Sequence, residues 1–186
     1  MTDRTLTIPH VLSERLVRGS VLTNVLLVIG GSAVIAIAAQ IAISVPFSPV
    51  PLTMQPLAVL LVGATLGARR GAAAAALYIL EGASGLPVFS QGRGGALWLA
   101  GPTAGYLLSY PFAAMVAGWF SERGWGVRGL FAALAVIYAG GFTWLAVLSG
   151  PANAFTWGIA PFVIADLVKV AFGAALLPLA QKLITR

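Results

Sequence analysis

The chain has 186 residues, of which 59% are hydrophobic and 9% are charged, and it contains no cysteine. Because a soluble domain carries roughly 25% charged residues, this composition excludes a water-soluble monomer, and its hydrophobicity excludes a disordered chain. The net charge of +6 comes from eleven Lys and Arg that form no cluster, which argues against nucleic-acid binding and leaves an integral membrane protein.

The first third of the chain contains a long uncharged stretch. No charged residue occurs over positions 19–68, which is long enough for two helices of about 20 apolar residues each. Three prolines over 45–51 prevent one continuous helix. We therefore expect a first membrane span over about 21–44 and a second over about 52–67.

The residues before the first span are polar and include the only histidine, His10. A cleavable signal peptide has an apolar core of about 7–15 residues, whereas the apolar run here is longer and follows a long polar segment. We therefore expect the first span to be retained, and His10 to lie in a surface segment without a catalytic or metal-binding role.

Four further spans are expected over about 70–81, 103–120, 128–148 and 158–181. A Gly/Pro-rich stretch over 82–102 separates the third span from the fourth, and its length and composition suit a lid or binding loop. The sequence thus predicts an all-α integral membrane protein, a single domain over 1–186 that forms a bundle of six transmembrane helices.

The distribution of basic residues orients this bundle, because Lys and Arg are concentrated in the cytoplasmic loops of membrane proteins. Nine of the eleven fall at one set of span ends, whereas the opposite loops contain only Arg93. We therefore expect both termini in the cytoplasm and the 82–102 loop outside. The nine residues are Arg4, Arg15, Arg18, Arg69, Arg70, Arg123, Arg128, Lys182 and Arg186.

Two ionisable residues interrupt the sixth expected span. Asp166 and Lys169 are three positions apart, so both lie on one helix face, and Asp166 is expected about 13 Å below the outer surface at 1.5 Å per residue. One interpretation is an ion pair that only packs the bundle. The other is a ligand site, since ionisable residues inside a membrane are commonly functional.

Three more polar side chains are expected in the outer half of the bundle. Gln55 is near the start of the second span, Glu81 ends the third, and Arg93 lies between glycines in the 82–102 loop. Each has an ordinary explanation by itself: an interhelical hydrogen bond for Gln55, an outward-pointing helix end for Glu81, and a solvated loop for Arg93. Together with Asp166 and Lys169 they predict an outward-facing pocket capped by the Gly/Pro-rich loop.

Aromatic residues near the outer span ends have two interpretations. Trp and Tyr are common in belts at the membrane interface, which is the default interpretation for Tyr106, although Tyr106 is also a candidate ligand contact. Phe89 and Trp98 lie in the loop over 82–102 and are candidates for covering an apolar ligand.

Small residues four positions apart occur in the first expected span, at Ala38 and Ala42. Such spacing permits close helix approach in lipid. These two residues are therefore candidates for contact with another subunit.

Motifs for catalysis are missing from the sequence. There is no nucleotide-binding Gly-x-x-x-x-Gly-Lys-Ser/Thr string, and a single histidine without cysteine argues against most zinc sites. No Gly-x-Ser-x-Gly elbow is present. We therefore expect no enzyme, metal site or cofactor in this chain, and uphill transport by it would need ion coupling or a partner.

Several strings of the sequence, taken in order, resemble the BioY family of biotin transporters. The resemblance covers about residues 45–172. It departs from the family pattern at Pro56, where the family usually has Thr, and the position of Glu81 is more variable in the family. The strings are Pro49–Gly63 (PVPLTMQPLAVLLVG), Leu66–Gly71, Tyr78–Phe89, Gly101–Tyr106 and Asp166–Lys169.

The resemblance implies an S component, the substrate-binding subunit of an energy-coupling factor transporter, in the bacterial inner membrane. It implies six helices, a biotin pocket near the outer face, a transmembrane coupling protein as partner, and ATPase subunits that would use the ATP. It also implies that Ala38 and Ala42 belong to the docking face. Whether this protein works with or without the coupling module stays open.

The chemistry of biotin can be matched to the candidate residues. Asp166 and Glu81 can accept hydrogen bonds from the ureido N–H groups, and Gln55 or Lys169 can donate to the ureido carbonyl. The carboxylate of the valerate chain requires a cation, for which Arg93 and Lys169 are rivals. The four charged residues sum to zero, so biotin would add a net charge of −1. Either one acid is protonated, or the pocket tolerates the excess.

Other functions remain as alternatives. An S component for a different vitamin would have the same architecture. A stand-alone transporter or channel, or a small intramembrane enzyme, is the alternative from another class. A channel needs a polar path across the membrane, whereas the inner halves of the expected spans are nearly free of polar residues.

Overall fold

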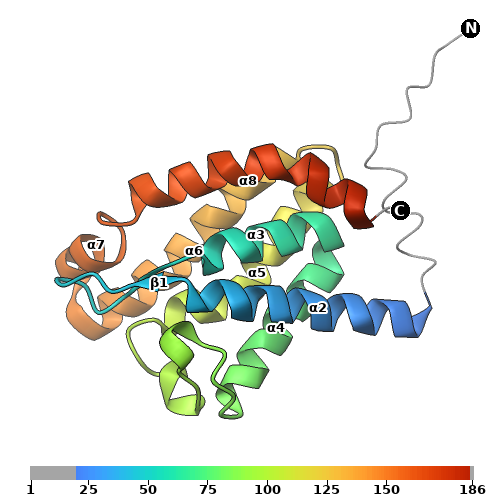
Figure 1. Ribbon diagram of the computed structural model, residues 1–186. Helices are drawn as coiled ribbons and strands as arrows, with labels where there is room; N and C mark the ends of the chain where they lie inside the picture. Colours follow the sequence, from blue (N-terminus) through green and yellow to red (C-terminus); the bar gives the residue numbers. More distant parts are fainter. Residues whose placement is uncertain (1–19, 185–186) are drawn as a thin grey trace, which may run out of the picture.

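Seven α-helices follow one another along the part of the chain that the computed structural model describes, residues 20–184 (Figure 1). The prediction of an all-α fold is confirmed at this level. Two short 3₁₀ helices and one pair of two-residue strands are the only other regular elements within the described residues. The helices are α2 (Val21–Gln40), α3 (Gln55–Leu66), α4 (Ala68–Ala83), α5 (Ala104–Ser121), α6 (Gly126–Ser149), α7 (Pro151–Gly158) and α8 (Val163–Ile184).

The length and composition of the helices identify a membrane protein. Within the described residues, three helices are long and apolar enough to cross a bilayer: α2, α6 and α8. Helix α3 is apolar but has only 12 residues, which at 1.5 Å per residue is about 18 Å, less than the roughly 30 Å of a bilayer's hydrocarbon core. The number of spans therefore stays a prediction.

Helix α2 ends at Gln40, four residues before the expected end of the first span. The chain then forms strand β1 (Ala42–Ile43), which pairs antiparallel with strand β2 (Leu52–Thr53). The expectation that Ala38 and Ala42 share one helix face is therefore wrong, because Ala42 lies in β1. Ala38 is partly buried against the protein's own core.

The second and third expected spans are separated by a single residue. Helix α3 ends at Leu66 and α4 begins at Ala68, with Gly67 at φ +86° and ψ 170° between them. Only glycine adopts this backbone conformation readily, so Gly67 breaks the helix without a loop.

Helix α8 begins at Val163, five residues after the expected start of the sixth span at about residue 158. Pro151 occupies the first turn of α7, a position that proline favours, and the chain turns again before α8 begins at Val163. Asp166 therefore lies in the first turn of α8, about 5 Å along its axis at 1.5 Å per residue. The assumption of one continuous helix from Trp157, on which the expected depth of about 13 Å rested, is therefore wrong.

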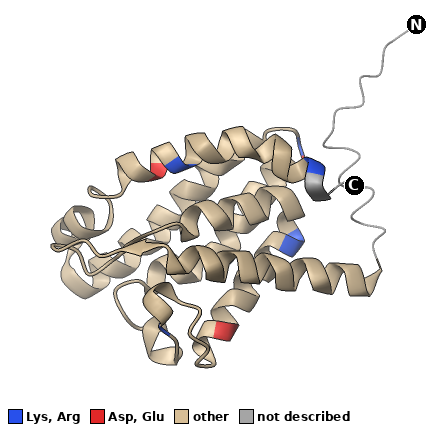
Figure 2. Ribbon diagram, viewed as in Figure 1, with Lys and Arg blue, Asp and Glu red and all other residues tan. Residues whose placement is uncertain are grey.

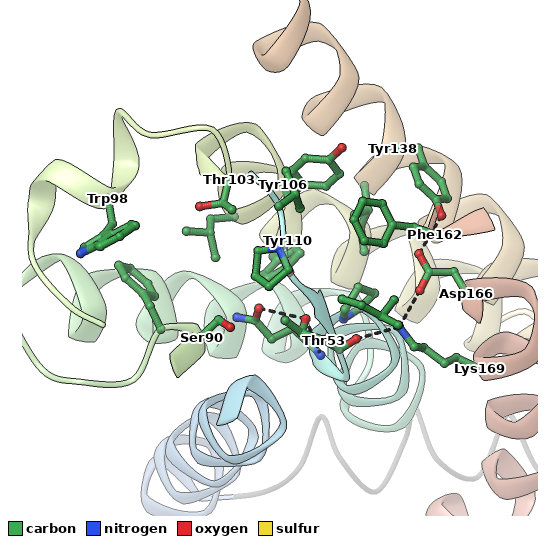
Figure 3. A pocket seen from close by; sticks show the side chains of 18 of the residues that line it. Thr53, Ser90, Trp98, Thr103, Tyr106, Tyr110, Tyr138, Phe162, Asp166 and Lys169 are labelled. Carbon is green, nitrogen blue, oxygen red and sulfur yellow. Dashed lines mark hydrogen bonds and ion pairs between the residues drawn. The ribbon is translucent and has the colours of Figure 1, made fainter. Parts of the chain in front are cut away.

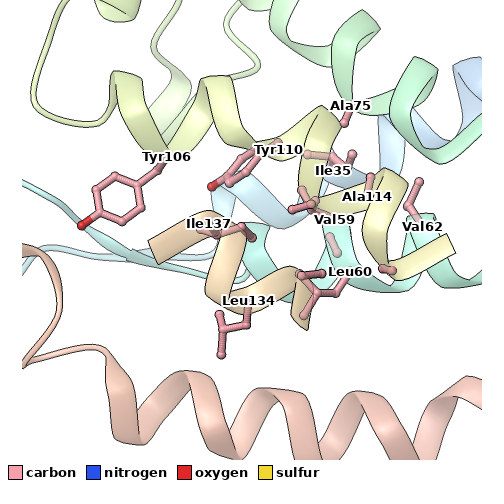
Figure 4. Close-up of a cluster of buried hydrophobic side chains, with 14 of the residues drawn as sticks. Ile35, Val59, Leu60, Val62, Ala75, Tyr106, Tyr110, Ala114, Leu134 and Ile137 are labelled. Carbon is pink, nitrogen blue, oxygen red and sulfur yellow. The ribbon is translucent and has the colours of Figure 1, made fainter. Parts of the chain in front are cut away.

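The core is built around α5, which packs against α3, α4 and α6. Glycines permit close approach here: a Cβ added at Gly63 of α3 would collide with the backbone of Ala114 of α5, and one at Gly105 of α5 with the backbone of Gly140 of α6. Contacts between small residues are the usual way that helices pack in membranes. Figure 4 shows side chains of the resulting apolar cluster.

Figure 2 marks the positions of the charged residues on the ribbon. Most of the described Lys and Arg gather at the end formed by the α3–α4 turn, the α5–α6 turn and the C-terminal part of α8. The strand pair, α7 and the Gly/Pro-rich loop lie at the opposite end (Figure 1). Four of the nine residues used to predict the orientation, and His10, lie outside the described residues: Arg4, Arg15, Arg18 and Arg186.

Candidate functional site

A cavity opens at the end of the bundle that carries the loop. The space between its walls is about 710 Å³, including the part open to the surface. Strand β2, the loop, α5, α6 and α8 all contribute to its wall (Figure 3). The polar and aromatic residues of the wall include Thr53, Gln55, Phe89, Ser90, Arg93, Trp98, Tyr106, Tyr110, Tyr138, Phe162, Asp166 and Lys169.

A buried ion pair forms the α8 end of the cavity. Lys169 Nζ lies 2.7 Å from Asp166 Oδ1 and also donates to the backbone carbonyl of Thr53 at 2.7 Å. The Tyr138 hydroxyl donates to Asp166 Oδ2 at 2.7 Å. These dashed contacts in Figure 3 join α8, α6 and β2. Both carboxylate oxygens are therefore held by protein donors, as a charge inside a membrane requires.

Gln55 is fixed at both ends of its amide. Its Oε1 accepts from the Thr53 hydroxyl at 3.1 Å, and its Nε2 donates to the Tyr78 hydroxyl. Gln55 is the first residue of α3 and is almost fully buried. It therefore ties the strand that supplies the Thr53 carbonyl to α4.

The loop closes the other end of the cavity. It contains the two 3₁₀ helices, η1 (Ser90–Gly92) and η2 (Ala96–Leu99). The Arg93 guanidinium carbon lies 4.5 Å from the centre of the Trp98 ring, a cation–π contact. Within residues 20–184, Arg93 forms no salt bridge. Figure 3 shows Trp98 and Ser90 at the opposite end of the cavity from Asp166 and Lys169.

Aromatic side chains form the wall between the two ends. Tyr106 and Tyr110 come from α5, one helical turn apart, and Phe162 precedes α8. The Tyr106 hydroxyl donates to the carbonyl of Gly158 at 2.7 Å, which fixes the ring at the cavity wall. Such a wall suits an apolar ligand body.

Seven of the eight candidate residues from the sequence lie together at this cavity. They are Gln55, Phe89, Arg93, Trp98, Tyr106, Asp166 and Lys169. The eighth, Glu81, does not line it. Its carboxylate accepts a hydrogen bond from the fully buried Ser32 hydroxyl of α2, so Glu81 joins α2 to α4 and does not face the cavity.

Tyr138 and Thr53 are wall residues that the sequence interpretation missed. A signal for Tyr138 existed, because a tyrosine ten residues inside an apolar span is too deep for an interfacial belt. No signal existed for Thr53, which contributes a backbone carbonyl. Ser90 was also missed; its buried hydroxyl has no hydrogen-bond partner among residues 20–184 and lies at the cavity wall.

The position of Glu81 changes the charge balance of the site. Asp166 and Lys169 neutralise each other, and Arg93 leaves the cavity wall with a net charge of +1. A ligand with one carboxylate would therefore bring the cavity to neutrality. The excess of −1 expected when Glu81 is included does not arise.

Comparison with known proteins identifies relatives. The sequence profile of the BioY family matches residues 9–186. The probable biotin transporter BioY of Pyrococcus horikoshii is 39% identical over 139 residues, which cover 75% of this chain and 84% of that protein. The biotin transporter BioY of Rhizobium etli is 42% identical over 149 residues, which cover 72% and 79%. The biotin transporter BioY of Thermotoga maritima is 40% identical over 137 residues, which cover 71% and 81%.

A solved structure has a similar fold. It is the crystal structure of the S-component for biotin from an ECF-type ABC transporter, with a TM-score of 0.78. The match covers 89% of this chain and 92% of that one at 20% sequence identity. At this identity the likeness establishes the fold.

Proposed function

The chain belongs to the BioY family, and we propose that it is the biotin-binding component of a biotin transporter. Its relatives are named as transporters, so it is a transport protein rather than an enzyme. One observation carries the proposal: a single cavity has a buried ion pair at one end, an arginine at the other and aromatic side chains between them.

The α8 end suits the ureido ring of biotin, which has two N–H donors and one carbonyl acceptor. Each carboxylate oxygen of Asp166 accepts one protein hydrogen bond and can accept another. Lys169 uses two of its three N–H donors, on Asp166 and on the Thr53 carbonyl. Asp166 accepts from the ureido N–H, and the third N–H of Lys169 donates to the ureido carbonyl. Gln55 supports this end by holding Thr53.

The loop end suits the carboxylate of the valerate chain. Arg93 has no salt bridge within the described residues, whereas Lys169 is already paired with Asp166. A guanidinium can bind a carboxylate through two parallel hydrogen bonds. Arg93 is therefore the carboxylate ligand in this proposal, and the unpartnered Ser90 hydroxyl lies at the same end as a further donor.

The aromatic wall suits the remaining part of biotin. The tetrahydrothiophene ring and the alkyl chain are apolar and would lie between Tyr106, Tyr110 and Phe162. Phe89 and Trp98 cover them from the loop. In this arrangement biotin reaches from Asp166 and Lys169 at one end of the cavity to Arg93 at the other.

The transport cycle would need partners. We propose that the cavity faces outward in the cytoplasmic membrane, that the chain crosses it six times with both termini inside, and that a transmembrane coupling protein and ATPase subunits drive release of biotin inward. The described basic residues at the end opposite the cavity support this orientation (Figure 2). Any ATP would be bound by the partner subunits.

Equilibrium binding to the purified full-length protein tests the proposal. Titration with biotin is expected to show one saturable site. Asp166→Asn and Arg93→Gln should each weaken binding by at least about tenfold, because each removes a charge-assisted hydrogen bond to the ligand. Glu81→Gln, the same acid-to-amide change outside the cavity, should leave the affinity unchanged.

Competing ligands distinguish biotin from other vitamins. Desthiobiotin retains the ureido group and the carboxylate and should compete, whereas thiamine and riboflavin should not. Displacement by thiamine or riboflavin but not by desthiobiotin would assign the cavity to a different vitamin. Loss of biotin binding in Glu81→Gln but not in Asp166→Asn would refute the site assignment.

A further inference from the structure

Gln40, the last residue of α2, reaches across to the loop that closes the cavity. Its Nε2 donates to the carbonyls of Val88 and Phe89 at 3.2 and 3.3 Å, and its Oε1 accepts from the N–H of Gly92 at 3.0 Å. The same Nε2 is 3.1 Å from the Ala36 carbonyl of its own helix, which fixes the direction of the side chain. One amide thus holds both sides of a single turn.

That turn carries three residues of the cavity wall: Phe89, Ser90 and Arg93. Phe89 and Arg93 form a backbone bridge, with the Phe89 N–H donating to the Arg93 carbonyl at 2.9 Å. Between them lie Ser90 and Gln91, and Gln91 has φ +63°, the only non-glycine residue with positive φ in the described chain. Such a conformation is unfavourable for a residue with a side chain and persists only where the surroundings hold it.

Few other contacts hold the tip of the turn. Phe89 is anchored in the core against Tyr78, and the N–H of Gly95 donates to the Gly82 carbonyl at 2.7 Å. Between these anchors, Gln40 ties the turn to the end of α2. A hydrogen bond from Gln91 Nε2 to Ser44 Oγ ties it to the chain that follows α2. Loss of Gln40 would therefore free the turn while its anchors remain.

We propose that Gln40 is a positioning residue of the site: it holds the Phe89–Arg93 turn so that the Arg93 guanidinium faces the cavity, and it thereby sets the affinity for the ligand's carboxylate. This inference rests on the proposed function. Gln40 itself does not line the cavity, so its effect passes through Arg93.

A pair of ligands separates this role from a general structural one. Biotin carries the carboxylate, and biotinamide replaces it with a neutral amide. Gln40→Met removes the hydrogen bonds and keeps the side-chain length. It should weaken biotin binding by about tenfold, as expected for the loss of one or two hydrogen bonds, and change the affinity for biotinamide by less than about twofold. In an Arg93→Gln background, Gln40→Met should add no further loss.

Matched variants complete the test on the purified full chain. Asn153→Leu removes another exposed amide, which donates to the Ser149 carbonyl at 2.9 Å, and should affect neither ligand. If Gln40→Met does not fold, Gln91→Met, which cuts the second tether of the turn, should give a smaller loss with the same preference for biotin over biotinamide.

Two outcomes would overturn the inference. Equal losses for biotin and biotinamide would assign Gln40 to the fold rather than to the carboxylate, and unchanged biotin affinity in Gln40→Met would exclude a positioning role. Failure of the unsubstituted protein to bind either ligand would refute the proposed function itself, so the two failures are distinguishable.

Discussion

At the scale of single residues, Asp166 and Lys169 stabilise each other in a region where one uncompensated charge is costly. Their side chains are 8% and 12% exposed, and Tyr138 and the Thr53 carbonyl complete their hydrogen bonds. Removing one partner of a buried pair typically costs about 3–5 kcal/mol, whereas removing both is often close to neutral. Stability and ligand binding should therefore respond differently to substitution.

The pair predicts a specific pattern of stabilities. Lys169→Met and Asp166→Asn should each lower the unfolding temperature, since each leaves one buried group without its partner. The double variant Asp166→Asn/Lys169→Met should recover most of the stability but no biotin binding. Thermal unfolding monitored by tryptophan fluorescence, with biotin titration of the same samples, checks both. A double variant that unfolds at as low a temperature as the less stable single variant would contradict this account of the pair.

The charge balance of the cavity predicts that biotin binds without proton exchange. A wall with a net charge of +1 takes up one carboxylate and becomes neutral, so no acid has to be protonated. Calorimetric titrations at one pH in buffers of different ionisation enthalpy should give the same binding enthalpy. A binding enthalpy that varies with the buffer would mean that protons are taken up or released on binding. An acid such as Glu81 would then have to take part in binding.

The charged residues of the cavity wall were predictable because charged groups inside an apolar chain are few. Asp166, Lys169 and Arg93 are conspicuous in the sequence for this reason. Glu81 does not line the cavity, because its direction depends on where Ser32 of α2 packs, a tertiary contact across 49 positions. Gln40 was not predicted, since its role comes from the conformation of a distant turn.

At the scale of elements, prolines and glycines determine where helices end. The Pro-rich break after the first span was predictable. The separation of α3 from α4 at Gly67 and the short helix α7 were not, because an apolar run does not reveal a single-residue break. The strand pair was also missed, since two-residue strands form only where the tertiary fold brings them together.

Gly67 gives a prediction at this scale. Gly67→Ala should lower the free energy of unfolding by about 1–3 kcal/mol, because the backbone conformation there is nearly restricted to glycine. A Cβ would also lie 2.6 Å from Glu122 Oε1, which accepts a hydrogen bond from the Ala68 N–H at 2.8 Å. Chemical unfolding of the purified protein measures the loss.

The matched control is another glycine of the bundle. A Cβ at Gly30, in the middle of α2, meets nothing within 4 Å, so Gly30→Ala should be neutral or slightly stabilising. Both variants should retain the affinity for biotin, because Gly67 lies at the opposite end of the bundle from the cavity. Equal stability losses in the two variants would contradict the assigned role of Gly67.

At the scale of the whole molecule, the two ends of the bundle differ in charge and in shape. Basic residues gather at the end without the loop, and the cavity opens at the other (Figures 1 and 2). The sequence predicted this polarity from charge alone. It could not predict that Asp166 lies in the first turn of a separate helix, because that depends on the turn between α7 and α8.

Because the chain contains no cysteine, single cysteines can test its orientation. Ser84→Cys lies in the exposed loop, and Val127→Cys lies exposed at the start of α6. A membrane-impermeant thiol reagent should label Ser84→Cys in intact cells and Val127→Cys only after permeabilisation. Labelling of Val127→Cys alone in intact cells would reverse the orientation.

The most direct measurement is uptake of radiolabelled biotin by cells that lack their own biotin transporter and express this chain together with an energy-coupling module. We expect saturable uptake that is abolished in Asp166→Asn/Lys169→Met and retained in Glu81→Gln. Uptake no higher than in cells without the chain, although the folded protein is present in the membrane, would contradict the assignment of this protein to biotin transport.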